Sequence, residues 1–215
     1  MTDERSRAVE RLDRVRRDAD TPEATRKLYD EWARIYDKDL TDLHGYVAPQ
    51  ATARALADIM PDRSAPILDV GCGTGLVGRA LAACGCSCID GVDISPEMLA
   101  EAEKKGVYRK LTAQDLSQGA SAATDSYAAA IGVGVFSRQM LPPEVFEELL
   151  RLVRPGGQIA LMVRGDQFEA DGFGPKVREL AAAGRWRVLV QETVPYLDTL
   201  GETGNLVLAE VQAKP

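Results

Sequence analysis

The stretch Ile67-Leu68-Asp69-Val70-Gly71-Cys72-Gly73-Thr74-Gly75-Leu76-Val77-Gly78 decides the fold of this 215-residue chain. It joins a short apolar run to a glycine-rich turn and then to the first turn of a helix. Glycine lets the backbone turn sharply and lets a ligand approach it closely. A helix that starts directly after such a turn presents free N–H groups and the positive end of its dipole. The stretch therefore predicts a strand, a ligand-binding loop and a helix in succession.

An acidic residue, Asp93, ends the next apolar run after this loop. A carboxylate at this place can accept hydrogen bonds from both hydroxyl groups of a ribose. Counted from Gly73, the glycines match the G-x-G-x-x-G spacing of dinucleotide-binding proteins, in which an acid follows about 20 residues further on. Asp93 fits that spacing as well. A nicotinamide-dependent oxidoreductase is therefore one open interpretation.

Two further acids favour a cationic cofactor instead. Asp69 lies two residues before Gly71, where its carboxylate would repel a pyrophosphate but suit an ammonium or sulfonium group. Asp115 ends the third apolar run, where it can accept from an adenine amino group while the Leu116 N–H serves a ring nitrogen; a local Asx turn is the alternative for Asp115. Acids at three successive strand ends favour a cofactor with a positive charge, a ribose and an adenine.

Short apolar runs alternate with helical stretches along the rest of the chain, which predicts a parallel sheet with helices on both faces. Strands are expected at 67–70, 88–92, 111–113, 127–133 and 158–163, and helices at 50–60, 76–84, 96–105, 142–153 and 175–183. The last two runs, 186–194 and 205–211, have no helix between them, so they predict a hairpin and an antiparallel final strand.

The N-terminal segment, up to Leu40, is rich in acidic and basic residues alike and poor in core material. We expect one helix from Arg5 to Arg17 and a second that begins with Thr21 as its N-cap. The second helix places Tyr29, Trp32 and Tyr36 close together, although aromatic residues are few in this chain. It is interpreted either as a solvated helix packed on the domain or as a lid. The expected division is a helical cap at 1–48 and one compact domain at 49–215.

The net charge of −7 argues against nucleic-acid binding and against docking to an anionic membrane, because both need a basic surface. No apolar run approaches the roughly 18 residues that span a bilayer, and the charged N-terminus is unlike a secretory signal. The four cysteines are expected to be free thiols in a reducing cytoplasm. Cys84, Cys86 and Cys88 enter their strand at its N-terminal end, away from the ligand-binding edge, so no metal site is predicted there.

Four segments, in this order and spacing, resemble the class I S-adenosylmethionine-dependent methyltransferases. They are Ile67–Gly75, Gly91–Leu99, Gln114–Leu116 and Leu152–Gly157. A closer resemblance, to the Williams-Beuren-region methyltransferase-like proteins and their bacterial relatives, rests on Tyr29–Asp37, Gly45–Pro49, Gly132–Phe136 and Pro142–Glu144. Ser137–Met140 stands where those relatives carry a histidine-rich stretch, so their substrate is not carried over.

The resemblance implies S-adenosylmethionine as the cofactor and a set of residues that bind it. They are Tyr36, Asp69, Gly71, Cys72, Gly73, Asp93, Ile94, Met98, Gln114, Asp115, Leu116, Gly132 and Val133. Methyl transfer is an in-line displacement, so the protein supplies mainly alignment and exclusion of water. Candidate catalytic residues at the acceptor are His44, Tyr46 and Arg138, with Arg164–Asp166 after the fifth strand as a further candidate segment.

The sequence therefore predicts an α/β, Rossmann-like fold: a seven-stranded, mostly parallel sheet with one antiparallel strand, helices on both faces and an N-terminal helical cap. The expected function is methyl transfer from S-adenosylmethionine to a small-molecule acceptor, without nucleic-acid or membrane partners. A binding protein without turnover, an enzyme with another reaction and the nicotinamide-dependent oxidoreductase stay as alternatives, and the sequence leaves the oligomeric state open.

Overall fold

The computed structural model describes residues 2–213. One seven-stranded sheet runs through it in the order β3-β2-β1-β4-β5-β7-β6. The strands are β1 (Ile67–Val70), β2 (Ile89–Asp93), β3 (Lys110–Ala113), β4 (Tyr127–Val133), β5 (Val153–Arg164), β6 (Trp186–Leu197) and β7 (Glu202–Val211). Strands β3, β2, β1, β4 and β5 pair in parallel, and β7 is antiparallel to both of its neighbours. The predicted sheet with one antiparallel strand is confirmed.

The helices fill the predicted places, with one addition. They are α1 (Thr2–Asp18), α2 (Pro22–Asp37), α3 (Ala48–Ile59), α4 (Leu76–Ala83), α5 (Pro96–Glu103), α6 (Val145–Leu152), α7 (Gly165–Ala170) and α8 (Phe173–Ala182). Helix α7 was not expected. A π-helical turn, η1 (Lys38–Leu43), follows α2, and two short 3₁₀ turns are η2 (Leu116–Gln118) and η3 (Asp198–Leu200). The last strands are also longer than predicted, because their polar outer ends stay paired in the hairpin.

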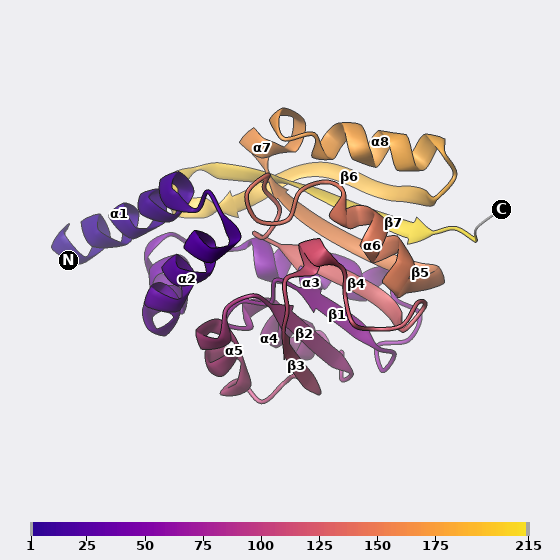
Figure 1. Ribbon diagram of the computed structural model, residues 1–215, viewed down its shortest axis with the longest axis horizontal. Coiled ribbons are helices and arrows are strands. Elements are labelled where there is room, and N and C mark those ends of the chain that lie inside the picture. Colours follow the sequence, from indigo (N-terminus) through magenta and orange to yellow (C-terminus); the bar gives the residue numbers. More distant parts are fainter. Residues whose placement is uncertain (1, 214–215) are drawn as a thin grey trace.

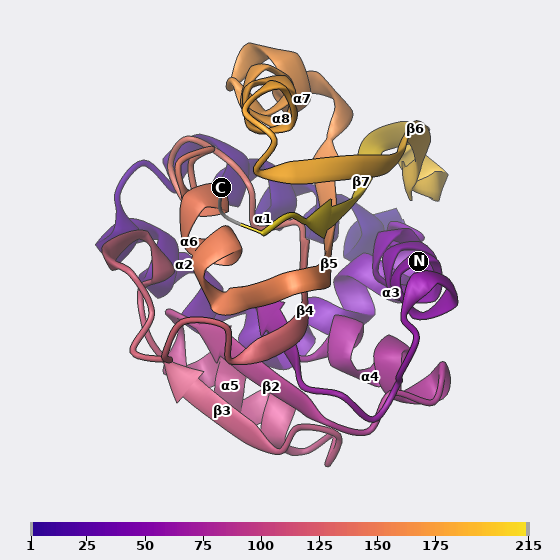
Figure 2. The ribbon, with the colours of Figure 1, turned by 90° about the vertical axis from the view of Figure 1, so that its right-hand side faces the viewer.

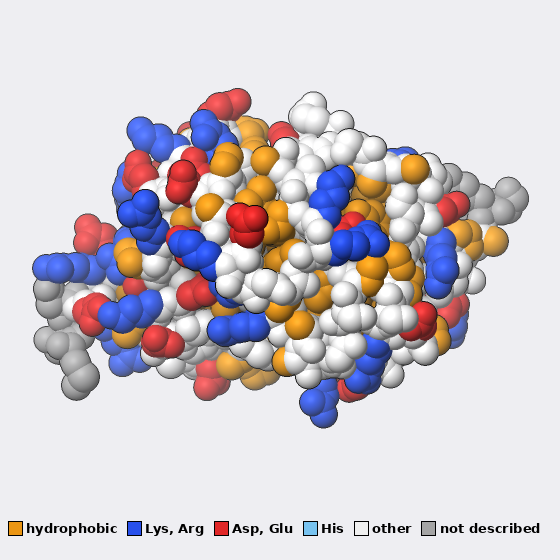
Figure 3. All heavy atoms as spheres, turned by 90° about the horizontal axis from the view of Figure 1, so that it is seen from below, with side chains coloured by type: hydrophobic (Ala, Val, Ile, Leu, Met, Phe, Trp, Pro, Cys, Tyr) orange, Lys and Arg blue, Asp and Glu red, His pale blue; other side chains and the backbone are white. Residues whose placement is uncertain are grey.

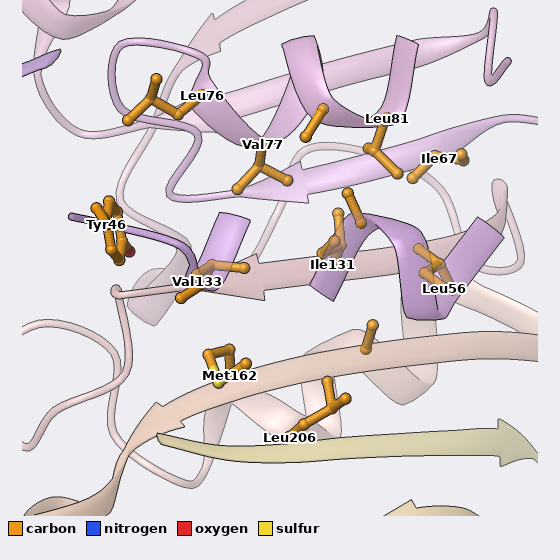
Figure 4. Close-up of a cluster of buried hydrophobic side chains, with 14 of the residues drawn as sticks. Tyr46, Leu56, Ile67, Leu76, Val77, Leu81, Ile131, Val133, Met162 and Leu206 are labelled. Carbon is orange, nitrogen blue, oxygen red and sulfur yellow. The ribbon is translucent and has the colours of Figure 1, made fainter. Parts of the chain in front are cut away.

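The sheet separates two apolar layers. Figure 2 shows α3 and α4 on one face of the sheet and α6 and α8 on the other. On the first face, side chains of α3 and α4 such as Leu56 and Leu81 meet Ile67 and Ile131 from the strands (Figure 4). On the second face, Phe146 and Trp186 are among the largest fully buried side chains, and their ring centroids are 5.6 Å apart. Because both faces are covered, β1 and β4 are buried along their whole length, as parallel strands usually are.

The N-terminal helices α1 and α2 lie at one end of the sheet, beside the carboxyl ends of the parallel strands (Figure 1). The buried carboxylate of Asp39, in η1, holds this segment together. It accepts hydrogen bonds from Trp32 Nε1 at 2.7 Å and from Arg11 Nε at 2.6 Å. One buried acid therefore ties α1, α2 and η1 into a single cap. Met1 and residues 214 and 215, which the predicted domain boundaries include, lie outside the described residues.

The surface of the cap carries both signs of charge. On the face seen in Figure 3, acidic and basic side chains are intermixed over the N-terminal end. Ion pairs within the cap include those of Arg14 with Glu31 and of Arg26 with Asp30. Within residues 2–213, none of the helices has the length and apolar character that crossing a membrane requires.

Candidate active site

The glycine-rich loop between β1 and α4 is shaped partly by a tyrosine. Tyr108 donates a hydrogen bond from its hydroxyl to Asp69 Oδ2 at 2.6 Å and accepts one from the Gly78 N–H at 3.2 Å. A Cβ atom on Gly78 would lie 2.3 Å from the Tyr108 hydroxyl. The third glycine of the dinucleotide-like spacing therefore makes room for a side chain of the protein, which removes one reason for a dinucleotide interpretation.

The carboxylate of Asp93 lies at the end of β2 and joins two loops. Its oxygens accept hydrogen bonds from the Gly73 N–H and the Ser95 N–H, each at 2.9 Å. Burial raises the pKa of Asp93, and these backbone N–H groups oppose that shift. Each carboxylate oxygen has a second lone pair, so Asp93 can still accept hydrogen bonds from a ligand.

A cavity that is partly open to solvent, with about 750 Å³ of empty space in all, lies between this loop, the ends of β2, β3 and β4, and helix α2. We call it the glycine-loop cavity. It is lined by Pro22, Thr25, Tyr29, Tyr36, Gly71, Gly73, Val92, Asp93, Ile94, Met98, Gln114, Asp115, Leu116, Val133, Gly134, Val135, Gln139, Met140 and Leu141. The structure thus brings together Tyr36, Gly71, Gly73, Asp93, Ile94, Met98, Gln114, Asp115, Leu116 and Val133 of the predicted cofactor set.

Three predicted cofactor residues lie outside that lining: Asp69, Cys72 and Gly132. Asp69 is fully buried beneath the loop, and burial raises its pKa to about 7 while the Tyr108 hydroxyl opposes the shift. Cys72 is also buried, and the space beside Gly132 is filled by the ring of Phe136. These three residues therefore support the glycine-loop cavity from within the domain and do not line it.

The adenine-contacting segment also makes local hydrogen bonds. Asp115 accepts from the Ser117 N–H at 2.9 Å and caps η2, so the Asx turn that the sequence left as an alternative is present. The Gln114 side-chain amide donates to the Gly119 carbonyl at 2.7 Å. Because both residues line the cavity as well, the turn holds the Leu116 N–H and the Asp115 carboxylate at its edge.

Helix α2 is fastened over the glycine-loop cavity by polar contacts at two places. Ser95, at the start of α5, donates to Asp30 Oδ1 at 2.5 Å. Further along α2, Asp37 accepts a hydrogen bond from Thr74 and pairs with the Lys105 ammonium at 2.8 Å. The hydroxyl of Thr25, between the lining residues, is buried without a hydrogen-bond partner. Helix α2 therefore covers the glycine-loop cavity, and its Thr25 hydroxyl is available to a ligand as a polar partner.

A second cavity, also partly open to solvent and with about 770 Å³ of empty space in all, adjoins the first beneath the cap. We call it the tyrosine cavity. It is lined by Leu12, Val15, Arg16, Ala19, Tyr29, Trp32, Tyr36, Leu40, Tyr46, Gly134, Phe136, Ser137, Gln139, Met140, Arg164, Gln167, Tyr196 and Leu197. Its lining residues come from segments that lie far apart in the sequence, among them α1, α2, the segment after β4 and the end of β6.

The two most buried tyrosines of this cavity meet at the end of β4. The segment that carries Tyr46 pairs with the end of β6, where the Val47 N–H donates to the Tyr196 carbonyl at 3.2 Å. The two tyrosine hydroxyls are 3.4 Å apart. A Cβ atom on Gly134 would lie 2.4 Å from the Tyr46 hydroxyl, so glycine is needed there for the approach. Figure 4 shows Tyr46 beyond Val133, at the end of β4.

Two predicted catalytic candidates lie outside both cavities. His44 is fully buried at the end of η1, and its two ring nitrogens have no hydrogen-bond partner. Arg138 is exposed, pairs with Asp171 at 3.4 Å and donates to the Ala170 carbonyl at 2.7 Å. Of the three candidates, only Tyr46 lines either cavity. In the segment after β4, Ser137, Gln139 and Met140 line the tyrosine cavity, whereas Arg138 does not.

Several site residues were not identified from the sequence. Thr25 and Gly134 sit among predicted neighbours, so spacing along α2 and β4 could have indicated them. Arg16 and Tyr196 carried no such signal, since they come from α1 and from the end of β6. Of the residues that the structure describes, no group of three or more His, Cys, Asp or Glu is arranged to hold a metal ion.

Comparison with known proteins agrees with this architecture. A family described as methyltransferase domain matches residues 67–157. Methyltransferase-like protein 27 of Homo sapiens is 35% identical over 196 residues, which cover 87% of this chain and 79% of that protein. The chain belongs to the class I S-adenosylmethionine-dependent methyltransferases. Its cofactor is S-adenosylmethionine, which supplies a methyl group activated on a positively charged sulfur.

Two further similarities show how widely the fold of this methyltransferase is used. The 18S rRNA (guanine(1575)-N(7))-methyltransferase of Saccharomyces cerevisiae is 35% identical over 88 residues, which cover 41% of this chain and 32% of that protein. The structure of the [4+2]-cyclase SpnF aligns with a TM-score of 0.68 at 16% identity, over 90% of this chain and 98% of that one. The second similarity concerns the fold alone.

The glycine-loop cavity has the chemistry that S-adenosylmethionine requires. It offers the acids Asp93 and Asp115 and the unpartnered hydroxyl of Thr25 as polar partners. Apolar walls such as Met98 and Leu141 surround them, and the aromatic ring of Tyr36 closes the side nearest the tyrosine cavity. Among the described residues, no basic side chain lines this cavity, which suits a cofactor that is itself a cation.

Proposed function

We propose that this methyltransferase transfers the methyl group to a small molecule that binds in the tyrosine cavity. The supporting observation is that the two cavities share part of their lining. The shared residues are Tyr29, Tyr36, Gly134, Gln139 and Met140. The cap covers the tyrosine cavity with Val15 and Trp32. Its mostly apolar and aromatic lining with a few polar groups is typical of small-molecule sites.

For the cofactor we propose a division of roles along the glycine-loop cavity. Asp93 accepts the ribose hydroxyls, and Asp115 with the Leu116 N–H contacts the adenine edge. Ile94 and Met98 pack near the adenine, and Gln114 supports the turn beneath it. The backbone of Gly71 and Gly73 holds the methionine end, and Val133 lines the floor beside the sulfur. The ring of Tyr36 faces the sulfonium, where a cation–π contact is worth on the order of 1 kcal/mol.

The residues of the tyrosine cavity orient the acceptor and exclude water from it. Burial raises the pKa of Tyr46 and of Tyr196, so both phenols stay neutral at physiological pH. We propose that one of them donates a hydrogen bond to the acceptor while the other supports it, since their hydroxyls are 3.4 Å apart. Tyr46 then acts as a positioning donor at the reacting atom, with no proton removed by the phenol itself.

We also propose that residues 1–48 act as one cap over the sheet domain and that the protein works in the cytoplasm on a soluble acceptor. The four free cysteines support a reducing compartment. The net charge of −7 and the mixed charges of the cap support a small molecule over a nucleic acid. Because one relative is named for rRNA methylation, RNA belongs among the acceptors that are tested.

Calorimetry tests the cofactor roles. We expect S-adenosylhomocysteine to bind the purified protein, and Asp93→Asn to weaken that binding at least about tenfold, because the amide replaces a charged acceptor of the ribose hydroxyls. Glu97→Gln, an exposed change in the first turn of α5, is the matched control. An unchanged dissociation constant in Asp93→Asn would remove the ribose role.

Turnover tests the reaction itself. Release of S-adenosylhomocysteine is measured with a panel of small molecules, with a peptide mixture and with RNA. We expect release with members of the small-molecule panel only. Cofactor binding without release from any acceptor would favour a different reaction, for which the fold similarity to a [4+2]-cyclase provides a precedent.

A further inference from the structure

The charged groups that line the tyrosine cavity are both guanidinium groups. Arg16 comes from α1 and Arg164 from the end of β5, and no carboxylate belongs to the described lining. The side chains of Arg16 and Arg164 are only 27% and 21% exposed. Charges that are partly removed from water interact more strongly with a ligand than charges on an open surface.

Each guanidinium is held in place by a carboxylate that does not itself line the cavity. Arg16 pairs with Glu202 through both terminal nitrogens, at 2.9 and 2.7 Å. Arg164 pairs with Asp166 at 2.6 and 2.9 Å. A guanidinium has five N–H donors in a rigid plane, so each of these pairs uses only part of its capacity. The remaining donors can bind a second planar acceptor with two oxygens, such as a carboxylate.

The rest of the cavity adds no negative charge. Burial raises the pKa of Tyr29, Tyr46 and Tyr196, so these three phenols are neutral. The hydrogen bond from Tyr46 and the charges of Arg164 and Arg16 lower the pKa of Tyr196 against the effect of burial. Both arginines line the same cavity as Tyr46 and Tyr196. Apolar and aromatic surface in the same cavity comes from Trp32, Leu40 and Phe136.

Resting on the proposed function, we propose that the acceptor is a small molecule with an apolar or aromatic body and a carboxylate, and that Arg164 and Arg16 bind this carboxylate. The apolar body then lies against Trp32, and the atom to be methylated lies beside the hydroxyls of Tyr46 and Tyr196. Arg138, which the sequence suggested as a candidate residue at the acceptor, lies outside this cavity. In this proposal the acceptor carboxylate is bound by residues from α1 and β5 instead.

Three probes with one body and different charges test this specificity: 4-hydroxyphenylacetate, its neutral amide, and the amine tyramine. Each is titrated into the protein loaded with S-adenosylhomocysteine. We expect the carboxylate to bind about tenfold more tightly than the amide, with the amine weakest, because only the carboxylate makes charged hydrogen bonds to arginine. This preference should decrease as the salt concentration rises.

Two variants separate a binding role from a structural one. Arg164→Gln should reduce the preference for carboxylate over amide to near one. Asp166→Asn should increase it, because it removes a carboxylate that competes for the same guanidinium; its side chain is 65% exposed, so the fold tolerates the change. The control Arg138→Gln should leave the preference unchanged. Loss of packing alone would not move the two variants in opposite directions.

The outcomes distinguish this inference from the proposed function. Binding of the amine as tightly as the carboxylate, or a preference that Arg164→Gln leaves intact, would overturn the carboxylate specificity. Normal binding of S-adenosylhomocysteine with no binding of any probe would overturn it too and leave the cofactor roles standing. Failure to bind S-adenosylhomocysteine would count against the cofactor roles themselves.

Discussion

The buried pair of Asp69 and Tyr108 shows how single residues shape the glycine loop. The Tyr108 ring occupies the space that side chains on Gly75 and Gly78 would fill, and its hydroxyl donates to Asp69. Two glycines of the motif therefore serve internal packing, while Gly71 and Gly73 line the cavity. The second carboxylate oxygen of Asp69 is buried without a hydrogen-bond partner, so burial dominates the titration of this acid.

Asp69 predicts a measurable pH dependence of stability. Burial raises the pKa of Asp69 to about 7, whereas an unfolded aspartate titrates near about 3.9. Between these values the folded protein binds a proton that the unfolded chain releases, so the contribution of Asp69 to stability decreases as the pH rises. The decrease approaches about 1.4 kcal/mol per pH unit within that window.

Urea denaturation of the wild type and of Asp69→Asn at several values between pH 4.5 and 7.5 measures this contribution. We expect the stability of the wild type to decrease relative to the variant over that range. The neighbouring Asp93 also has a raised pKa and acts in the same direction in the wild type, so the difference between the two curves, which includes the coupling of Asp93 with Asp69, is the quantity compared. Parallel curves would show that Asp69 is ionised in the folded protein throughout.

At the scale of the element, α2 combines a local start signal with long-range contacts. Thr21 caps the helix by accepting the Ala24 N–H at 3.2 Å, and Pro22 stands at its first position. These two features are visible in the sequence. Two sets of contacts hold α2 over the glycine-loop cavity: Asp30 with Ser95, and Asp37 with Thr74 and Lys105. These contacts depend on the position of the helix in the folded protein.

The contact at Asp37 predicts an effect on affinity. In Asp37→Asn the ion pair with Lys105 is lost, so conformations in which α2 has moved away from the glycine-loop cavity become more populated. Because the competent form is then rarer, the dissociation constant for S-adenosylhomocysteine should increase about threefold to tenfold. Calorimetry measures it, with Glu31→Gln, which loses only the exposed pair with Arg14, as the control. Equal affinities in both variants would mean that the Asp37–Lys105 ion pair is not required to hold α2 over the cavity.

At the scale of the whole molecule, both cavities lie between the cap and the carboxyl edge of the sheet. The sheet edge is rigid, because β1 and β4 are buried and paired on both sides. The cap is held by a few polar contacts and by the buried cluster at Asp39. We therefore expect the cap to open as a unit while the sheet stays closed.

Hydrogen exchange tests this division. S-adenosylhomocysteine should slow amide exchange in residues 22–43 and 93–98, because ligand binding suppresses local opening of the segments around it. Residues 186–194 of β6, far from the glycine-loop cavity, should exchange at the same rate with and without ligand. Protection of 93–98 without protection of 22–43 would show that the cap is not a lid.

The order of strands and helices, the glycine loop and the acid at the end of β2 could be predicted from the sequence. Apolar periodicity and glycine spacing are local signals, and the carboxyl ends of parallel strands meet at one edge wherever the chain alternates in this way. The same logic brought Asp93, Asp115 and Val133 to one cavity. His44 and Arg138 line neither cavity, because no local pattern in the sequence tells which side of a loop faces inward.

By itself, then, the sequence determined the sheet, the cofactor class and the residues that reach the glycine-loop cavity from strand ends. The tertiary structure alone decided the lining of the tyrosine cavity, which brings Arg16 and Tyr46 together with Arg164 and Tyr196 from distant parts of the chain. It also decided that Tyr108 fills the space beside Gly78. The physical reason is the range of the information: hydrogen bonding and periodicity act along neighbouring residues, whereas the shape and charge of a cavity arise only when distant segments pack together.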